Sequence, residues 1–279
     1  MPDPNPPEFL MALEKYLFEN ARGTSYEEPI RRAYMDFSRF FGWIELVEPY
    51  LKLNGKKVLD SGCGVGGMMV ALAQKGAVPY GIEVSEDLFR MANARLAGFD
   101  GAHVELLRSD RLPFDDETFD AVFSLHVVEH VQNLEIYFNE MFRVMKKGGV
   151  ALMEFPSRFF PIEPHNNLYL IPYLPKSVSN ALCRAFAGSG FLGADLSLRL
   201  RNAADDSQLA NFLTRCAVKK YLVTRARILS ESYNKERLLG EAMNTSKPYG
   251  RMLSAVPWAF LGHFSWIFQR NITLIFEKS

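Results

Sequence analysis

The chain contains the stretch Val58-Leu59-Asp60-Ser61-Gly62-Cys63-Gly64-Val65-Gly66-Gly67, which continues as Met68-Met69-Val70-Ala71-Leu72-Ala73. Apolar residues end in a carboxylate and give way to four glycines within six residues, after which apolar residues return at helical spacing. This pattern predicts a β-strand, a tight turn and the start of an α-helix. Glycine lets the backbone pass close to a ligand, and the free N–H groups of a helix N-terminus attract electron-rich groups. We therefore expect a nucleotide-containing cofactor at this turn.

Beyond the turn, short apolar strands alternate with helical segments. Helices are expected at residues 67–75, 86–97 and 134–145. Strands are expected at residues 58–60, 78–84, 104–107, 119–124 and 150–155, with a turn at 146–149 and two later strands at 218–229 and 271–277. This alternation predicts a doubly wound, Rossmann-like α/β fold with a mainly parallel sheet.

Two further regions flank or interrupt this pattern. Apolar residues recur at helical spacing in residues 9–20 and 30–51, so residues 1–54 are expected to form an N-terminal helical lid over the cofactor. Residues 55–279 would form the main domain. Within it, residues 156–215 combine prolines, aromatic residues and a helical pattern at 182–212, which predicts a helical insertion that faces the substrate.

The composition narrows the range of partners. The 279-residue chain has 32 Lys and Arg against 32 Asp and Glu, so it lacks the basic surplus of a typical nucleic-acid-binding protein. Three widely spaced cysteines and an N-terminus without a signal-peptide pattern favour a reduced, cytoplasmic setting. No apolar run reaches the ~20 residues of a membrane-spanning helix. The aromatic-rich residues 256–268 are expected to pack in the core, or alternatively to make a peripheral contact with a membrane surface.

The residues around the glycines indicate which cofactor binds. Gly62-x-Gly64-x-x-Gly67, with Glu83 about twenty residues later, is shared by NAD-dependent and S-adenosylmethionine-dependent enzymes, because both bind a ribose diol. Asp60 favours S-adenosylmethionine, since its carboxylate would attract an ammonium group and repel a pyrophosphate. Another carboxylate, Asp110, follows the third expected strand, where it could accept a hydrogen bond from an adenine amino group.

With these motifs in order, and with Lys147-Gly148-Gly149 before the fifth strand, residues 58–155 resemble the class I S-adenosylmethionine-dependent methyltransferases. The resemblance implies S-adenosylmethionine as the cofactor and a seven-stranded sheet whose last strand, at 271–277, is antiparallel. It implies that Asp60, Gly62 and Gly64 hold the methionine part. It also implies that Glu83 binds the ribose and that Asp110 and Leu112 lie near the adenine. The neighbours expected to line the same site are Ser61, Cys63, Val84, Arg111 and Leu125.

Other interpretations of these residues stay open. Glu83 and Asp110 would also be normal as solvated acids at strand ends, and Asp60 would also cap the glycine turn. The same glycines leave two alternative functions, an NAD(P)-dependent oxidoreductase and a cofactor-binding protein without catalysis.

A cluster of ionisable residues, His126-x-x-Glu129-His130, follows the fourth strand. It matches the inverted zincin pattern, but that pattern needs a longer helix and a third ligand downstream. Some methyltransferases of this class carry Glu-x-x-Glu-His here and bind a divalent metal. His126 replaces the first Glu, and Mg²⁺ prefers carboxylate oxygens, so we expect no metal. The expected general bases are His130, His126 and the downstream His165, with packing at the pocket wall as the alternative for His130.

The methyl acceptor is predicted only by class. The fourth strand does not end in an Asn/Asp-Pro-Pro-Tyr type of motif, so an adenine or cytosine amino group is not expected. Aromatic and polar residues at 155–173 favour an apolar pocket with a few polar groups, although they would also brace an insertion. We expect methyl transfer from S-adenosylmethionine, at oxygen, to a small molecule, a sugar or a lipid-linked acceptor.

Overall fold

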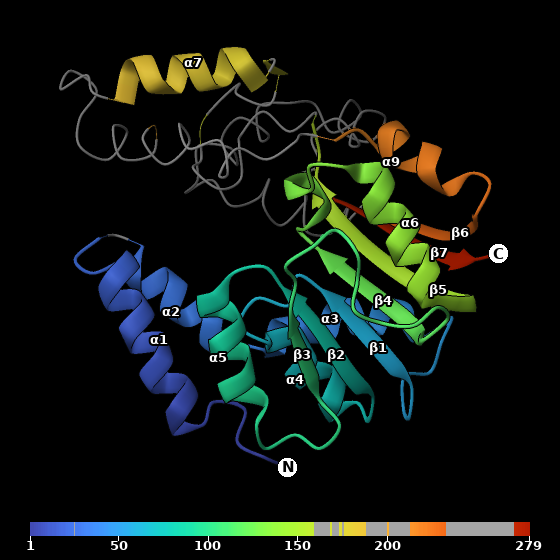
Figure 1. Ribbon diagram of the computed structural model, residues 1–279, viewed down its shortest axis with the longest axis horizontal. Helices are drawn as coiled ribbons and strands as arrows, with labels where there is room; N and C mark the ends of the chain where they lie inside the picture. Colours follow the sequence, from blue (N-terminus) through green and yellow to red (C-terminus); the bar gives the residue numbers. More distant parts are fainter. Residues whose placement is uncertain are drawn as a thin grey trace, which may run out of the picture.

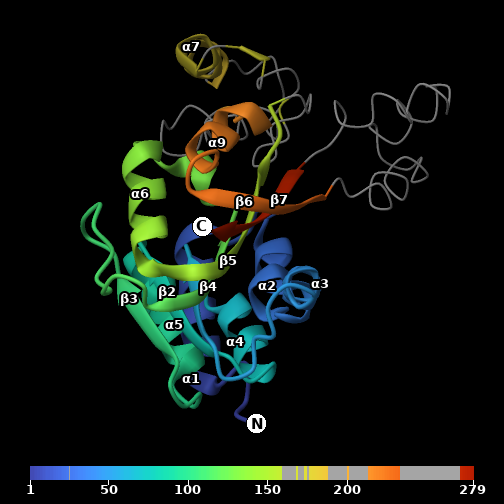
Figure 2. The same ribbon diagram turned by 90° about the vertical axis from the view of Figure 1, so that its right-hand side faces the viewer.

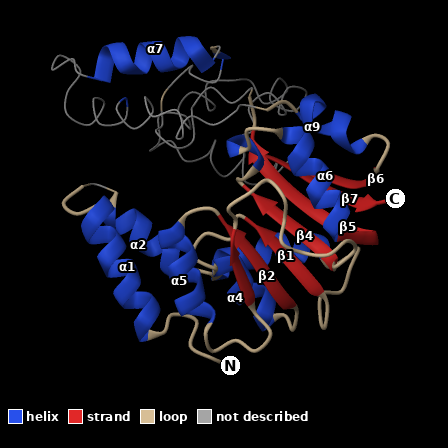
Figure 3. Cartoon of the chain, in the orientation of Figure 1, coloured by secondary structure: helices blue, strands red, loops and turns tan. Residues whose placement is uncertain are grey.

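The computed structural model describes residues 1–24, 26–158, 168, 173–174, 176–187, 200, 213–232 and 271–279. Within these residues, seven strands form one sheet in the order β3-β2-β1-β4-β5-β7-β6 (Figures 1 and 3). The strands are β1 (Lys57–Ser61), β2 (Val78–Glu83), β3 (His103–Leu106), β4 (Phe119–Leu125), β5 (Met145–Pro156), β6 (Ala226–Ser232) and β7 (Asn271–Lys278). β1 to β5 pair in parallel, whereas β7 runs antiparallel to both β5 and β6. The predicted fold, including its antiparallel last strand, is confirmed.

The strand order positions the site. Successive strands step outward from β1 to β3, and the chain then returns to β4 on the other side of β1. At such a switch point the loops after the two central strands turn in opposite directions and leave a crevice at the carboxyl ends. The glycine turn after β1 and the turn after β4 therefore meet at one place.

Helices cover both faces of the sheet (Figure 2). α6 (Leu134–Val144) and α9 (Arg215–Leu222) pack on one face, while α3 (Phe41–Val47) and α4 (Gly67–Gln74) pack on the other. The central strands are buried on both sides, which explains their continuous apolar sequences. The fully buried residues that fill the two layers include Phe138, Val144 and Phe276 on the first face and Ile44, Ala71 and Phe123 on the second.

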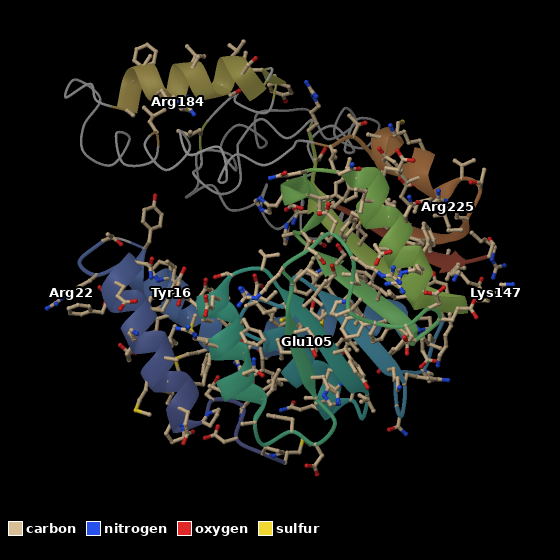
Figure 4. The ribbon with its side chains drawn as sticks, in the orientation of Figure 1. Tyr16, Arg22, Glu105, Lys147, Arg184 and Arg225 are labelled. Carbon is tan, nitrogen blue, oxygen red and sulfur yellow. The ribbon has the colours of Figure 1, made fainter. Side chains whose placement is uncertain are left out.

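The first two helices pack beside the sheet rather than on it. α1 (Pro7–Asn20) lies against α5 (Glu86–Leu96), and α2 (Glu27–Met35) follows α1. Figure 4 shows Tyr16 of α1 on this side of the molecule, whereas Lys147 and Arg225 lie at the opposite side. The lid role predicted for residues 1–54 stays a prediction.

A buried arginine, Arg95, holds the N-terminal segments that surround α1 and α2, which are called the N-terminal block below. The Arg95 guanidinium of α5 is fully buried and donates to the carbonyl oxygens of Pro4, Tyr34 and Met35 at 2.7 to 2.9 Å. It also donates to the side chain of Asn5 at 2.8 Å. Burial lowers the pKa of Arg95 to about 10, so the guanidinium is still charged at neutral pH. One cation therefore ties two N-terminal segments to the helix after β2.

Three local predictions are wrong in detail. The helix expected at 30–51 ends at Met35, because Asp36 is extended and its carboxylate accepts bonds from the Ser38 amide and hydroxyl. A short 3₁₀ helix, η1 (Ser38–Phe40), then precedes α3. The turn expected at 146–149 lies inside β5, where a bulge with Gly148 at a φ of 71° absorbs the extra residues.

The strand expected at 218–229 is also divided. The Thr214 side chain accepts a bond from the Ala217 amide and caps α9, and β6 begins only at Ala226. Val218 and Leu222 recur at helical spacing and are both fully buried, which stabilises a helix there. Of the helix expected at 182–212, the structure describes α7 (Lys176–Ala187), beyond the carboxyl ends of β4 and β5 (Figure 1). No helix in the described ranges has both the length and the apolar character needed to cross a bilayer.

Candidate active site

The glycine turn is shaped by its backbone contacts. The amides of Gly62 and Cys63 both donate to the Ile82 carbonyl oxygen of β2, at 3.0 and 2.9 Å. Gly62 has a φ of 75°, and a Cβ built there would lie only 2.5 Å from Cγ2 of Val127. Only glycine fits this position, because the turn after β4 packs directly against it. Cys63 is buried against Gly81, so it acts as a packing residue.

Glu83, the last residue of β2, holds the turn from the other side. One carboxylate oxygen accepts a 2.8 Å bond from the Gly64 amide, and the other accepts bonds from the Val84 and Ser85 amides at 2.8 and 2.9 Å. The side chain is only 6% exposed, yet it lines the cavity described below. A carboxylate can accept about four hydrogen bonds, so Glu83 keeps capacity for a ligand hydroxyl.

Asp60 is a buried acid at the end of β1. It is 3% exposed, and no hydrogen bond from the described residues contributes to the pKa of its carboxyl group. Burial, together with the nearby charge of Glu83, raises the pKa of Asp60 to about 8. A buried acid in this state gains from a cationic ligand, because a positive charge restores its ionised form.

A cavity of about 510 Å³ opens at the carboxyl ends of β1, β2 and β4. Its walls bring together six of the predicted cofactor residues and one predicted base: Ser61, Gly62, Glu83, Val84, Asp110, Leu112 and His130. Asp60, Cys63, Gly64, Arg111, Leu125 and His126 lie outside the lining. His165 and residues 256–268 fall outside the described residues. The cavity suits a nucleoside-sized ligand, because acidic groups face it from two strand ends while apolar side chains cover the rest.

Tyr137 of α6 is a cavity residue that sequence reasoning missed. Its hydroxyl lies 3.2 Å from the Ser61 hydroxyl and 2.7 Å from that of Ser124. These bonds join α6 to the ends of β1 and β4. In the sequence Tyr137 is one more aromatic residue in an amphipathic helix, so no local signal distinguishes it from core.

The loop that carries Asp110 is anchored by an ion pair on α6. Glu140 accepts a 2.8 Å bond from the Leu112 amide and pairs with Arg143 at 2.7 Å. Arg143 in turn donates to the Leu112 carbonyl oxygen at 3.0 Å. Leu112 is therefore held through both its N–H and its C=O group, which fixes the loop where it lines the cavity.

The ionisable cluster after β4 is divided between two environments. His130 lies in η2 (Val128–His130) and lines the cavity. His126 instead lies between two acids, with Nδ1 3.4 Å from Glu129 and Nε2 3.2 Å from Glu154. Partial burial alone would lower the pKa of His126, but these two contacts raise it to about 9. A ring that is already protonated is poorly suited to act as a base, which leaves His130 as the better placed candidate.

The described residues form no metal cluster, but they do fit the cofactor. In the ranges that the structure describes, no group of three or more His, Cys, Asp or Glu residues is arranged to hold a metal ion. S-adenosylmethionine fits the residues present, because no described residue donates a hydrogen bond to the Asp60 carboxylate and Gly64 leaves open space around its Cα.

Comparison with known proteins agrees with this geometry. Residues 59–153 match the family profile described as "Methyltransferase domain". Residues 59–153 are therefore a methyltransferase domain. S-adenosylmethionine is the cofactor of this domain, as the resemblance implied.

The matches to curated relatives cover the methyltransferase domain rather than whole proteins. A demethylmenaquinone methyltransferase of Tropheryma whipplei is 34% identical over 132 residues, which is 45% of this chain and 54% of that protein. A 24-methylenesterol C-methyltransferase of Arabidopsis thaliana is 39% identical over 102 residues, 34% of this chain and 28% of that protein. The chain spans about half the length, or less, of these relatives.

Solved structures share the fold of this chain. Geranyl diphosphate C-methyltransferase from Streptomyces coelicolor superposes with a TM-score of 0.57 at 16% identity, covering 96% of this chain and 88% of that one. A phosphoethanolamine N-methyltransferase from Haemonchus contortus gives a TM-score of 0.56 at 15% identity, covering 95% and 59%. At these identities the likeness concerns the fold alone.

Proposed function

We propose that the protein transfers the methyl group of S-adenosylmethionine to a small, largely apolar acceptor that carries an acidic hydroxyl. The observation that carries the proposal is the cavity itself, in which Glu83 and Asp110 face the same space as His130. The first two residues suit the ribose and adenine of the cofactor. His130, which lines the same cavity, suits the acceptor.

The chemistry needs little from the protein beyond alignment. When bound, the cofactor would supply a methyl group on a sulfonium, whose sulfur would keep the electron pair of the broken S–C bond and become a neutral thioether. Holding the acceptor in line with that bond supplies much of the rate. His130, as general base, would take the proton of the acceptor hydroxyl as the new bond forms.

A hydroxyl on an aromatic or enol system leaves two acceptor atoms open. Once deprotonated, such a group can be methylated at its oxygen or at the conjugated carbon. The sequence predicts oxygen. The relatives named demethylmenaquinone methyltransferase and 24-methylenesterol C-methyltransferase support lipid-soluble acceptors, and the second name keeps carbon as the second candidate.

The experiment supplies methyl-labelled S-adenosylmethionine with a lipid extract and, separately, with a water-soluble extract. We expect label in the organic phase, on a product whose mass spectrum gives the methylated atom. His130→Asn should lower the rate about 10²–10⁴-fold with cofactor affinity retained. His103→Asn, an exposed histidine at the start of β3, is the matched control and should behave as wild type. Label found only on macromolecules would contradict the proposal.

A further inference from the structure

The backbone turns sharply at His126, directly after β4. Its φ of 57° lies in the left-handed region, a conformation shared among the described non-glycine residues only with Glu117. The amide of His126 still donates a 2.8 Å bond to the Glu154 carbonyl oxygen. A non-glycine residue keeps such a conformation when its surroundings fix it, so the contacts of its side chain are informative.

Glu129 needs a cation beside it. The residue is fully buried, and neither of its carboxylate oxygens has a hydrogen-bond partner in the described part of the chain. Burying an unpaired carboxylate is costly. The ring of His126, 3.4 Å away, is the cation that the described ion pairs give it.

Glu154 gives the other side of the ring a rigid anchor. Its carboxylate accepts bonds from Trp43 Nε1 at 2.9 Å, Thr273 Oγ1 at 2.8 Å and Asn271 Nδ2 at 3.0 Å. Although burial opposes it, these contacts and His126 lower the pKa of Glu154 to about 2, so the group stays ionised. Among the described residues, the charged groups that contact the ring are thus one carboxylate from η2 and one from β5. The groups from α3 and β7 that donate hydrogen bonds to Glu154 are neutral.

The same short turn forms a wall of the cavity. Val127 follows His126 and packs against Gly62, and Val127, His130 and Val131 all line the cavity. Any change in the course of the chain at His126 therefore moves the side chain of His130 relative to the glycine turn.

We propose that His126 is a positioning residue, whose ring between Glu129 and Glu154 fixes the turn at 126–131 and so aligns His130 in the cavity. The claim that this turn aligns an acceptor rests on the proposed function. The claim that His126 sets the position of His130 does not rest on it.

The test is a double-mutant cycle on the protein labelled with ¹³C-histidine. His126→Asn keeps a residue that tolerates a positive φ but removes the cation. Glu129→Gln removes the negative charge that the His126 cation compensates. We expect His126→Asn to shift the ring signal of His130, and the double variant to return it toward the wild-type position. His103→Asn, remote from the turn, should leave that signal unchanged.

Kinetic measurements give a second test, because a purely structural role would not predict a loss of acceptor kcat/KM with unchanged cofactor affinity. His126→Asn should lower kcat/KM for the acceptor by up to about 100-fold while the Kd for S-adenosylhomocysteine stays at the wild-type value. The double variant should recover most of that loss. An unshifted His130 signal in His126→Asn, or an equal loss in the single and double variants, would overturn the proposal. If His126→Asn fails to fold, an unshifted His130 signal in Glu129→Gln would overturn it too. Absence of methyl transfer by the wild type would count against the proposed function only, because the His130 signal is read without turnover.

Discussion

The carboxylate of Glu83 accepts a 2.8 Å hydrogen bond from the amide of Gly64, nineteen residues earlier in the chain. This bond joins the end of β2 to the glycine turn after β1. The acid thus has two tasks, since it shapes the turn and also presents an oxygen to the cavity. A ribose-binding acid that also supports the loop should be unusually sensitive to substitution.

Glu83→Ala should therefore weaken binding of S-adenosylhomocysteine by about 100-fold or more, because bonds to a charged acceptor contribute about 1.5–3 kcal/mol each. Isothermal titration calorimetry measures this directly. Glu86→Ala, an exposed acid three residues later, is the control and should change little. Unchanged affinity in Glu83→Ala would remove Glu83 from the site.

Asp60 should make cofactor binding depend on pH. Its raised pKa of about 8 means that the carboxyl is mostly protonated at pH 7, and the positive charge of S-adenosylmethionine favours the ionised form. Binding at pH 7 should release close to one proton, and affinity should rise as pH increases through 8. Calorimetry in buffers of different ionisation enthalpy counts the protons. Asp60→Asn should abolish the release, and a release that persists in this variant would assign the proton to another group.

The same shift predicts how Asp60 affects folding. Its pKa is higher in the folded protein than in an unfolded chain, so its contribution to stability is greatest at acidic pH. That contribution is lost as pH rises toward 8. Asp60→Asn should therefore flatten the pH dependence of the free energy of unfolding between about pH 4 and 8.

Gly62 and Gly55 form a matched pair for testing the contact with Val127. Both have positive φ values, 75° and 72°, but an added Cβ meets Val127 at Gly62 and open space at Gly55. Gly55→Ala should cost about 1–2 kcal/mol of unfolding free energy from backbone strain alone. Gly62→Ala should cost about 1–3 kcal/mol more, because Val127 must move. Urea unfolding gives both values, and equal costs would show that the contact is unimportant.

Arg95 should determine how firmly the N-terminal block is held to α5. Arg95→Met keeps the length of the side chain but removes the donors to Pro4, Tyr34 and Met35, and we expect a loss of about 2–4 kcal/mol. Limited proteolysis should then cut first within residues 1–54. Arg90→Met, on the exposed side of α5, should stay within about 0.5 kcal/mol of wild type. A wild-type cleavage pattern in Arg95→Met would mean that other contacts hold the block.

The sequence predicts those features that depend on residues close together in the chain. The glycines need positive φ values or close contacts, and the acids follow apolar strands, so the fold and the acidic part of the cavity lining were predictable. The helix capped by Thr214 was not, because Val218 and Leu222 fit either a strand or a buried helix until their packing is known.

Residues whose roles depend on distant partners were also missed. Tyr137 gains its role from Ser61 and Ser124 on two different strands. Arg95 gains its role from carbonyl oxygens of the N-terminal segments, and such partners leave no pattern around the residue itself. His126 was grouped with His130 by spacing alone, whereas the structure places the two rings in different environments.

The most direct test of the account is calorimetric titration of the wild-type protein with S-adenosylhomocysteine and, in parallel, with NADH. We expect saturable one-site binding of S-adenosylhomocysteine and none of NADH, because the buried Asp60 carboxyl at the end of β1 would attract an ammonium group and repel a pyrophosphate. Tight binding of NADH with no binding of S-adenosylhomocysteine would contradict it.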